Sequence, residues 1–319
     1  MDILQLLISG IANGCIYGLL ALGFVLIYKA SEAVNFAQGD MLMLGAFLGI
    51  SFINADQANL PFLLGITFAA VIMGAFGYLL DRFILRGIFG QPQFAMVILT
   101  ISLGFLMRFV AGVIWGHSPV SLQTPFSGKM LALGSLSIAY VDLIIIISTI
   151  ALTSILYFFF AHTRLGIAMQ ASSQNQMAAY YMGIPVKRVN GIVWALSGVV
   201  AALAGILFAA KGAIEPSVGL LFGIKAFAAA VIGGLGSLPG ALAGGLLVGV
   251  IEPFAGRYLP LGLSQIAPYV VMLIVLIVRP GGIFFSGQTE KKYRSFDPSS
   301  FDSRMTKRPP KIFKDEYCP

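Results

Sequence analysis

Long apolar segments follow one another along almost the whole chain, separated by short polar stretches. Each is close to the roughly 20 residues that an α-helix needs to cross about 30 Å of hydrocarbon. The pattern therefore predicts an all-α, polytopic membrane helix bundle with about eight spans. Seven of the segments are uninterrupted: Ile3–Tyr28, Ala33–Ile53, Pro61–Leu80, Phe94–Ile114, Leu136–Phe160, Gly191–Ala210 and Ser264–Val278.

The remaining apolar segment, Leu221–Ile251, is interrupted by the glycine-rich run Gly233–Gly240. It is either one kinked span or two short segments joined by a loop within the membrane. A phosphate-binding loop requires a Lys followed by a hydroxyl residue, and this run has neither. We therefore expect a broken helix that is buried or lines a cavity, and no nucleotide site or other cofactor in this chain.

One polar insert, Thr163–Val186, separates the fifth and sixth apolar segments. Good helix formers predict a helix over Leu165–Met182, with Thr163 as its N-cap and Gly183 followed by Pro185 as its end. Helical spacing places five residues on one face, namely Leu165, Ala168, Met169, Ser172 and Gln176. Such a helix is too polar to cross a bilayer, so it either lies on lipid headgroups or docks into a groove of a soluble protein.

Composition supports the membrane assignment. The chain is 58% hydrophobic and 10% charged with a mean hydropathy of +0.91, whereas a soluble domain carries roughly 25% charged residues. The net charge of +7 comes from residues 81–92, residues 162–190 and a basic tail. Because cytosolic loops carry an excess of Lys and Arg, we predict that these three segments are cytosolic and that the amino terminus is outside. Because no basic stripe interleaves with aromatic residues, we expect no nucleic-acid partner.

The chain is expected to form one membrane domain, residues 1–286, and a polar, disordered cytosolic tail, residues 287–319, whose basic residues can touch anionic lipid. The first span has no cleavage signal, so we expect it to be retained. Cys15 and Cys318 are too few for a disulfide framework or a metal site.

Small residues recur at four-residue spacing within the spans. They include Gly10, Gly14, Gly18, Gly45, Gly49, Gly240 and Gly244. Such spacing lets helix backbones approach closely, either inside this bundle or against a second membrane subunit. Packing inside the bundle is the favoured interpretation.

Polar side chains within spans are costly and often mark solute routes. The candidate translocation path consists of Asn13, Asn35, Gln38, Arg108, Gly233 and Gly236. The alternative is that each polar group is hydrogen-bonded within the bundle or lies at an interface. We expect this alternative for Asp142, Glu252 and Arg257, and slightly favour it for Arg108, for which the sequence offers no evident partner.

Several motifs, in order and spacing, resemble those of the branched-chain amino-acid (LivH-type) permeases of ATP-binding-cassette importers, over Ile3–Phe285. They are the runs from Gly10 to Phe24, Asn35 to Met41, Thr163 to Gly166, Ile232 to Gly240 and Arg279 to Phe284, together with Tyr28, Ala179, Gly183 and Ile184. The resemblance implies a multi-pass permease of the bacterial inner membrane with no catalysis of its own.

The same resemblance implies a second permease subunit, a cytosolic ATPase dimer and a periplasmic solute-binding protein as partners. The insert would then contact the ATPase through Thr163, Arg164, Gly166, Met169, Ala179 and Gly183. Family members often carry charges in this region, whereas Ile167–Ala178 has none. Docking is therefore expected to rely on shape and neutral hydrogen bonds.

Other functions remain open at this point. A passive channel or an ion-coupled carrier is the main alternative, although His117 and His162 both lie in loops rather than spans. An intramembrane enzyme ranks last, because the chain lacks a metalloprotease motif and a Ser with a His at the same depth. Within the importer class, urea and short amides remain alternatives to amino acids as the solute.

Overall fold

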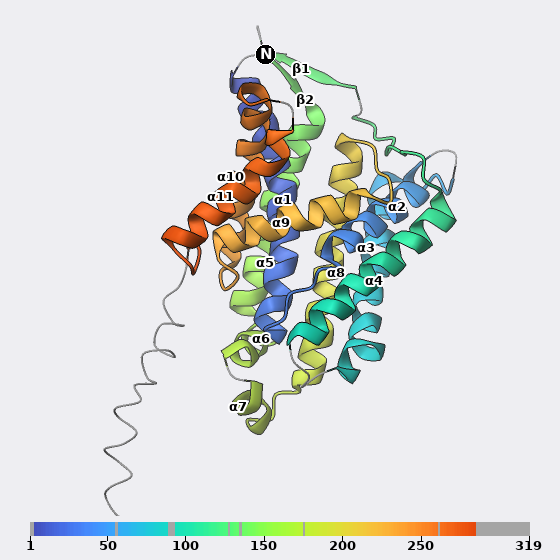
Figure 1. The fold of residues 1–319 in the computed structure, drawn as a ribbon. Coiled ribbons are helices and arrows are strands. Elements are labelled where there is room, and N and C mark those ends of the chain that lie inside the picture. Colours follow the sequence, from blue (N-terminus) through green and yellow to red (C-terminus); the bar gives the residue numbers. More distant parts are fainter. Residues whose placement is uncertain are drawn as a thin grey trace, which may run out of the picture. The chain divides into compact units, whose positions relative to one another are not determined.

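A computed structural model describes residues 3–54, 57–88, 93–126, 128–133, 136–174, 176–260 and 262–284. These residues form a helical bundle with one short β-hairpin (Figure 1). The elements are α1 (Ile3–Ser31), α2 (Gln38–Ile53), α3 (Phe62–Phe83), η1 (Leu85–Gly87), α4 (Gln93–Trp115), β1 (Met130–Leu133), β2 (Leu136–Ala139), α5 (Tyr140–His162), α6 (Arg164–Gln174), α7 (Gln176–Tyr181), α8 (Val186–Lys211), α9 (Val218–Gly233), α10 (Leu238–Tyr258) and α11 (Leu263–Val278). The predicted tail and Cys318 lie outside the described residues.

Among the described residues, six helices are long and apolar enough to cross a membrane, which confirms the predicted helical membrane bundle. They are α1, α3 extended through η1, α4, α5, α8 and α10. Three further apolar helices, α2, α9 and α11, have 16 residues each. At 1.5 Å per residue each is about 24 Å long, short of the thickness of the hydrocarbon layer. The number of eight spans therefore stays a prediction.

Two predicted spans begin later than expected. Helix α2 starts at Gln38 rather than Ala33, because the Asn35 side chain accepts a hydrogen bond from the Ala37 N–H (3.0 Å) and forms a turn there. Helix α5 starts at Tyr140 rather than Leu136, since Leu136–Ala139 pairs antiparallel with Met130–Leu133. Hydropathy alone does not distinguish a short apolar strand from the first turn of a helix.

The glycine-rich run separates two helices, α9 and α10, and the position of the turn within the membrane stays a prediction. Helix α9 ends at Gly233, and Gly234 has a positive φ of 98°, which favours glycine. Helix α10 begins after Ser237, whose hydroxyl oxygen accepts a hydrogen bond from the Gly240 N–H (3.2 Å). The chain after α11 covers this turn, because the Ile283 N–H donates to the carbonyl of α9 residue Ile232 (2.9 Å).

Glycines allow α1 and α10 to pack backbone against backbone. A Cβ built on Gly249 would lie 2.1 Å from the Cα of Gly14, and one built on Gly245 would lie 2.3 Å from the Cα of Gly18. Helices α2 and α8 meet in the same way, at Gly45. The predicted packing of small residues inside the bundle is thus confirmed for these glycines.

The described basic loops gather at one end of the bundle. Arg86, after α3, donates a hydrogen bond to the carbonyl of Lys187 at the start of α8 (3.1 Å). Lys29 at the end of α1, Gln170 of α6 and Leu238 at the start of α10 line one small hollow. The hairpin and the start of α1 lie at the opposite end (Figure 1). This separation agrees with the predicted common side of residues 81–92 and 162–190, whereas the third basic segment, the tail, is outside the described part of the chain.

Candidate functional site

The corner between α5 and α6 is built around Thr163. The Thr163 hydroxyl donates to the carbonyl of Phe159 (2.7 Å) near the end of α5, and it accepts from the Gly166 N–H (3.0 Å) in the first turn of α6. One side chain therefore ends one helix and begins the next, which confirms Thr163 as an N-cap. Gln170 strengthens the corner by donating to the carbonyl of Phe160 (2.9 Å).

Gly166 and Met169 form the inner face of α6. A Cβ on Gly166 would lie 2.5 Å from the carbonyl oxygen of Phe159, so only glycine fits against the end of α5. Met169 and Ser172 are also buried. Leu165, which the helical spacing places on the same face, is 43% exposed.

The predicted helix Leu165–Met182 is described as α6 and α7, which lie on either side of Asn175, so its continuity through that residue stays a prediction. In the last turn of α6 the Ser173 hydroxyl donates to the carbonyl of Gln170 (2.7 Å). Asn175 and the side chains of Gln176 and Met177 lie outside the described structure.

The end of α7 has the predicted form. Gly183 has a φ of 84°, its N–H donates to the carbonyl of Tyr180 (3.0 Å), and the Ile184 N–H donates to the carbonyl of Ala179 (3.0 Å). This pair of bonds is the Schellman motif, and it fixes the chain direction after α7. Ala179 itself is buried.

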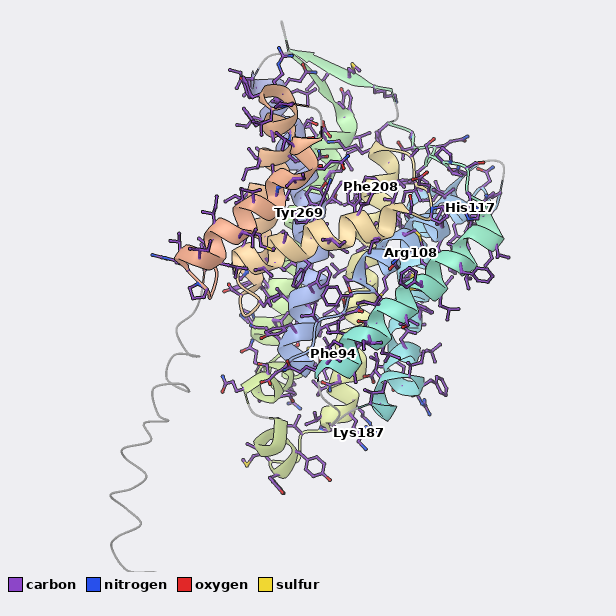
Figure 2. The ribbon with its side chains drawn as sticks, viewed as in Figure 1. Phe94, Arg108, His117, Lys187, Phe208 and Tyr269 are labelled. Atoms are coloured by element: carbon purple, nitrogen blue, oxygen red, sulfur yellow. The ribbon has the colours of Figure 1, made fainter. Side chains whose placement is uncertain are left out.

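The outer surface of this corner is largely apolar and aromatic. Tyr180, Tyr181 and Met182 are 66%, 78% and 83% exposed, and Arg164 is exposed at the start of α6. We call the exposed group Tyr180, Tyr181 and Met182 the α7 tip. It lies at the end of the bundle that also carries Lys187 (Figure 2). Exposed apolar groups of this kind are typical of interaction surfaces.

Two of the predicted path residues, Asn35 and Gln38, belong to a buried cluster with Ser197 of α8. The Asn35 amide donates to Oε1 of Gln38 (3.2 Å), and the Ser197 hydroxyl donates to the same oxygen (2.9 Å). Both residues are at most 1% exposed. Their polar groups hold α2 against α8. This favours the interpretation that both residues are hydrogen-bonded within the bundle, rather than exposed on a solute path.

Arg108 has a partner that the sequence did not reveal. Its Nε and Nη2 donate to Oδ1 (2.8 Å) and Oδ2 (3.3 Å) of Asp40, so the guanidinium holds the carboxylate with two hydrogen bonds. Arg108 lies on α4 (Figure 2), and the pair connects this helix with α2. This geometry favours the interpretation that Arg108 stabilises the bundle.

Within the described part of the chain, no hydrogen bond or ion pair joins the other predicted path residues to this cluster. Gly233 packs directly against Gly240, where an added Cβ would lie 2.0 Å from the carbonyl oxygen. Gly236 lies in the turn between α9 and α10, and Asn13 is half-buried on α1. Their place on a translocation path stays a prediction.

Two lysines pair with acidic residues, which the sequence alone did not reveal. Lys225 of α9 forms an ion pair with Glu252 of α10, which also accepts a hydrogen bond from the Tyr17 hydroxyl (2.7 Å). Lys211, at the end of α8, forms an ion pair with Asp142 (2.7 Å). Each lysine stands alone among apolar residues in the sequence. A charge in such a segment needs a partner, and this was the available signal for the two ion pairs. The pairs confirm that Glu252 and Asp142 are bonded within the bundle.

Comparison with known proteins identifies the family. Residues 6–277 match the family described as "Branched-chain amino acid transport system / permease component". The chain is 30% identical over 299 residues to the high-affinity branched-chain amino acid transport system permease protein LivH of Salmonella typhimurium, an alignment that covers 90% of this chain and 97% of LivH. It is 28% identical, with the same coverage, to BraD of Pseudomonas aeruginosa. A probable LivH of Methanocaldococcus jannaschii is 29% identical over 282 residues, 83% of this chain and 87% of that protein. This chain therefore belongs to the family of permease components of branched-chain amino acid transport systems.

Proposed function

We propose that this permease forms the path by which branched-chain amino acids enter a bacterial cell across the inner membrane, driven by ATP hydrolysis in a partner chain. A second permease subunit pairs with it, a periplasmic protein delivers the solute, and an ATPase dimer binds on the cytosolic side. The names of LivH and BraD support the choice of solute. The apolar helices support the location, because only a lipid environment suits surfaces such as that of α5.

The observation that carries the coupling role is the form of the α6–α7 corner, with a rigid base and an exposed tip. Thr163, Gly166 and Gln170 tie α6 to the end of α5. The Schellman motif at Gly183 ties the end of α7 to the start of α8. A push on the α7 tip is thus transmitted to two long helices at once, which is what a coupling element must do.

The chemistry of the tip suits a groove of a soluble partner. Two tyrosines and a methionine give contact area and hydrogen-bonding capacity without charge. Closure of an ATPase dimer around this tip would rock the attached spans, and the solute path would open alternately to the two sides. Docking through shape and neutral hydrogen bonds accords with the lack of charge over Ile167–Ala178.

The test is reconstitution of the full chain with the ATPase, second permease and binding protein encoded beside it. In proteoliposomes we expect ATP-dependent uptake of labelled leucine. Equal uptake without ATP would overturn the importer mechanism and favour a channel or ion-coupled carrier. Uptake of urea or short amides in place of leucine would overturn the choice of solute alone.

A matched pair of variants tests the α7 tip. Tyr181→Ala removes a 78% exposed ring from the tip, and Tyr258→Ala removes a 67% exposed ring from the end of α10. We expect Tyr181→Ala to weaken co-purification of the ATPase and Tyr258→Ala to leave it unchanged. Equal ATPase recovery from both variants would contradict the coupling role.

A further inference from the structure

Two hollows meet at the end of the bundle opposite to the α7 tip. The larger, about 460 Å³, lies between the hairpin, the start of α5 and the end of α8, and we call it the outer chamber; it is lined among others by Leu122, Lys129, Met130, Val141, Asp142 and Lys211. The smaller, about 180 Å³, reaches the start of α1 at Ser9. Met130, Ala139 and Asp142 line both hollows, so the Asp142 side chain stands where they adjoin.

The ion pair of Lys211 and Asp142 forms part of this wall. The Nζ of Lys211 lies 2.7 Å from Oδ1 of Asp142, 3.2 Å from Oγ of Ser9 and 3.3 Å from the carbonyl oxygen of Ser9. The Lys211 side chain is 23% exposed and the Asp142 side chain 11%. Both charges are therefore partly withdrawn from solvent and still reachable from the chamber.

Of the four ion pairs among the described residues, the other three are placed differently. The Arg108–Asp40 pair is tied by two hydrogen bonds between helices, and Glu252 of the Lys225 pair accepts a further bond from Tyr17. Neither of these pairs lines the outer chamber. The remaining pair joins Asp81, in the last turn of α3, to Arg86 of η1, at the end of the bundle where Arg86 contacts Lys187.

A Lys–Asp pair at the wall of a chamber is complementary to one class of solute. An α-amino acid at neutral pH carries an ammonium and a carboxylate a few bonds apart and has no net charge. Its carboxylate can take the place of Asp142 beside Lys211, while its ammonium takes the place of Lys211 beside Asp142. Every charge then stays paired throughout the exchange, and the large cost of an unpaired, desolvated charge is avoided.

A solute with one charge lacks this advantage. A lone carboxylate that replaces Asp142 leaves the aspartate without its cation, and a lone amine leaves Lys211 without its anion. The rest of the chamber suits an uncharged side chain, because Leu122, Met130 and Val141 line it with small residues of α8 and the loop after it. Its volume also lies in the range of small-molecule sites.

We propose that Lys211 and Asp142 form a subsite that binds the carboxylate and the ammonium of an α-amino acid before it crosses the permease. Ser9 positions the ammonium of Lys211 through two hydrogen bonds and keeps it in place during the exchange. This inference rests on the proposed function, because it assumes that an amino acid reaches this end of the bundle.

The first experiment measures binding to the purified full chain in lipid nanodiscs by ligand-observed NMR. The probes are leucine, 4-methylpentanoate, which lacks the ammonium, and 3-methylbutylamine, which lacks the carboxylate. We expect wild-type protein to bind leucine about 10-fold or more tighter than either analogue, as loss of a charged hydrogen bond implies. Equal affinities for the three probes would overturn the subsite.

The variants give opposite patterns that a merely structural role does not produce. Asp142→Asn should weaken leucine and the amine but not 4-methylpentanoate, whereas Lys211→Gln should weaken leucine and 4-methylpentanoate but not the amine. Lys211→Arg keeps the charge and should retain leucine binding within a few-fold. The proposal would also be overturned if Asp142→Asn and Lys211→Gln weakened the binding of all three probes to the same extent while Lys211→Arg left it unchanged.

Arg86→Gln is the matched control. Like Lys211, Arg86 is a partly exposed cation, 29% exposed, paired with a buried carboxylate, that of Asp81. We expect this variant to keep the wild-type discrimination among the three probes. A loss of discrimination as large as that of Lys211→Gln would show that the effect comes from general destabilisation and would overturn the assignment.

Transport by the complete importer separates this inference from the proposed function. If wild-type importer takes up no amino acid, the proposed function fails. If wild-type importer takes up leucine and both Asp142→Asn and Lys211→Gln do so at the wild-type rate, the subsite alone fails. We expect both variants to reduce uptake about 10-fold or more while ATPase recovery stays unchanged.

Discussion

Arg108 and Asp40 join α4 to α2 through a fork-shaped contact, with Nε 2.8 Å from Oδ1 and Nη2 3.3 Å from Oδ2. The Asp40 side chain is 1% exposed and that of Arg108 17%. A Cβ built on Gly104 would lie 2.3 Å from Oδ2 of Asp40, so a glycine in α4 leaves room for the carboxylate. The guanidinium carbon also lies 4.6 Å from the centre of the Phe105 ring, a cation–π contact.

The first prediction concerns this pair. Arg108→Gln leaves the buried carboxylate of Asp40 without its cation, and we expect the free energy of unfolding to fall by about 3 kcal/mol. Reversible unfolding in bicelles measures the change. The double variant Arg108→Met with Asp40→Leu removes both charges and should be more stable than the single variant. A single variant as stable as wild type would contradict the stabilising role.

The partner of Arg108 lies 68 residues away in the sequence, which explains why it was not predicted. Sequence patterns describe what a residue does within its own helix, whereas the choice of partner depends on how helices pack. The same holds for Lys211 with Asp142 and for Lys225 with Glu252. By contrast, the caps at Thr163 and Gly183 were predicted, because each depends on residues within one turn.

The second prediction concerns the close packing of α1 and α10. In Gly249→Ala the new methyl group would lie 2.1 Å from the Cα of Gly14, and a backbone atom cannot rotate aside. The helices must separate, and we expect a loss of about 1–3 kcal/mol in stability. Thermal unfolding of the purified variant measures it.

Gly87→Ala is the control for this packing. Among the described residues, no heavy atom other than those of Gly87 and its chain neighbours lies within 4 Å of a Cβ built there. We expect its midpoint of thermal unfolding to match that of wild type. Equal midpoints for Gly249→Ala and Gly87→Ala would show that α1 and α10 tolerate a wider separation than the structure implies.

Spacing of small residues was the other feature that the sequence predicted well, since Gly10, Gly14 and Gly18 follow a simple four-residue rule. The start of α5 was missed for the opposite reason. The pairing of Leu136–Ala139 with Met130–Leu133 is a contact between two segments, which hydropathy along the chain does not show.

The third prediction concerns the end of α7. Gly183 has a φ of 84°, a conformation that costs most other residues about 1–2 kcal/mol and a β-branched residue more. Gly183→Val should loosen the connection to α8 and lower ATP-driven leucine uptake several-fold, with membrane insertion intact. Gly183→Asn should retain most of the uptake, because Asn tolerates this conformation. Equal uptake by both variants would contradict the role of the Schellman motif.

Replacement of Ala179 by a charged residue provides the fourth prediction. Ala179 is 5% exposed, and its carbonyl accepts the Ile184 N–H. Ala179→Glu places an unpaired charge where α7 packs against the rest of the bundle, and such burial is costly. We expect uptake to be abolished while the protein still inserts into the membrane, measured as transport against membrane-fraction yield. Normal uptake by this variant would argue against a coupling role for α7.

The fifth prediction compares the two contacts of Glu252. Lys225 pairs with one of its carboxylate oxygens, and the Tyr17 hydroxyl donates to the other (2.7 Å). Lys225 also lies 5.9 Å from the centre of the Phe222 ring, so its charge has a second favourable contact. Lys225→Met leaves a partly buried carboxylate without its cation and should cost about 3 kcal/mol. Tyr17→Phe removes one hydrogen bond to a charged acceptor and should cost about 1.5 kcal/mol.

The order of these two effects distinguishes a charge pair from a hydrogen-bond network. If the ion pair dominates, Lys225→Met is less stable than Tyr17→Phe. Because both contacts involve Glu252, we also expect Tyr17→Phe to lower stability less in the Lys225→Met background than in the wild-type protein. Tyr157→Phe, at a 61% exposed tyrosine of α5, controls for loss of a hydroxyl and should lie within about 0.5 kcal/mol of wild type. Strictly additive losses in the double variant would show that Tyr17 and Lys225 hold α1, α9 and α10 together independently.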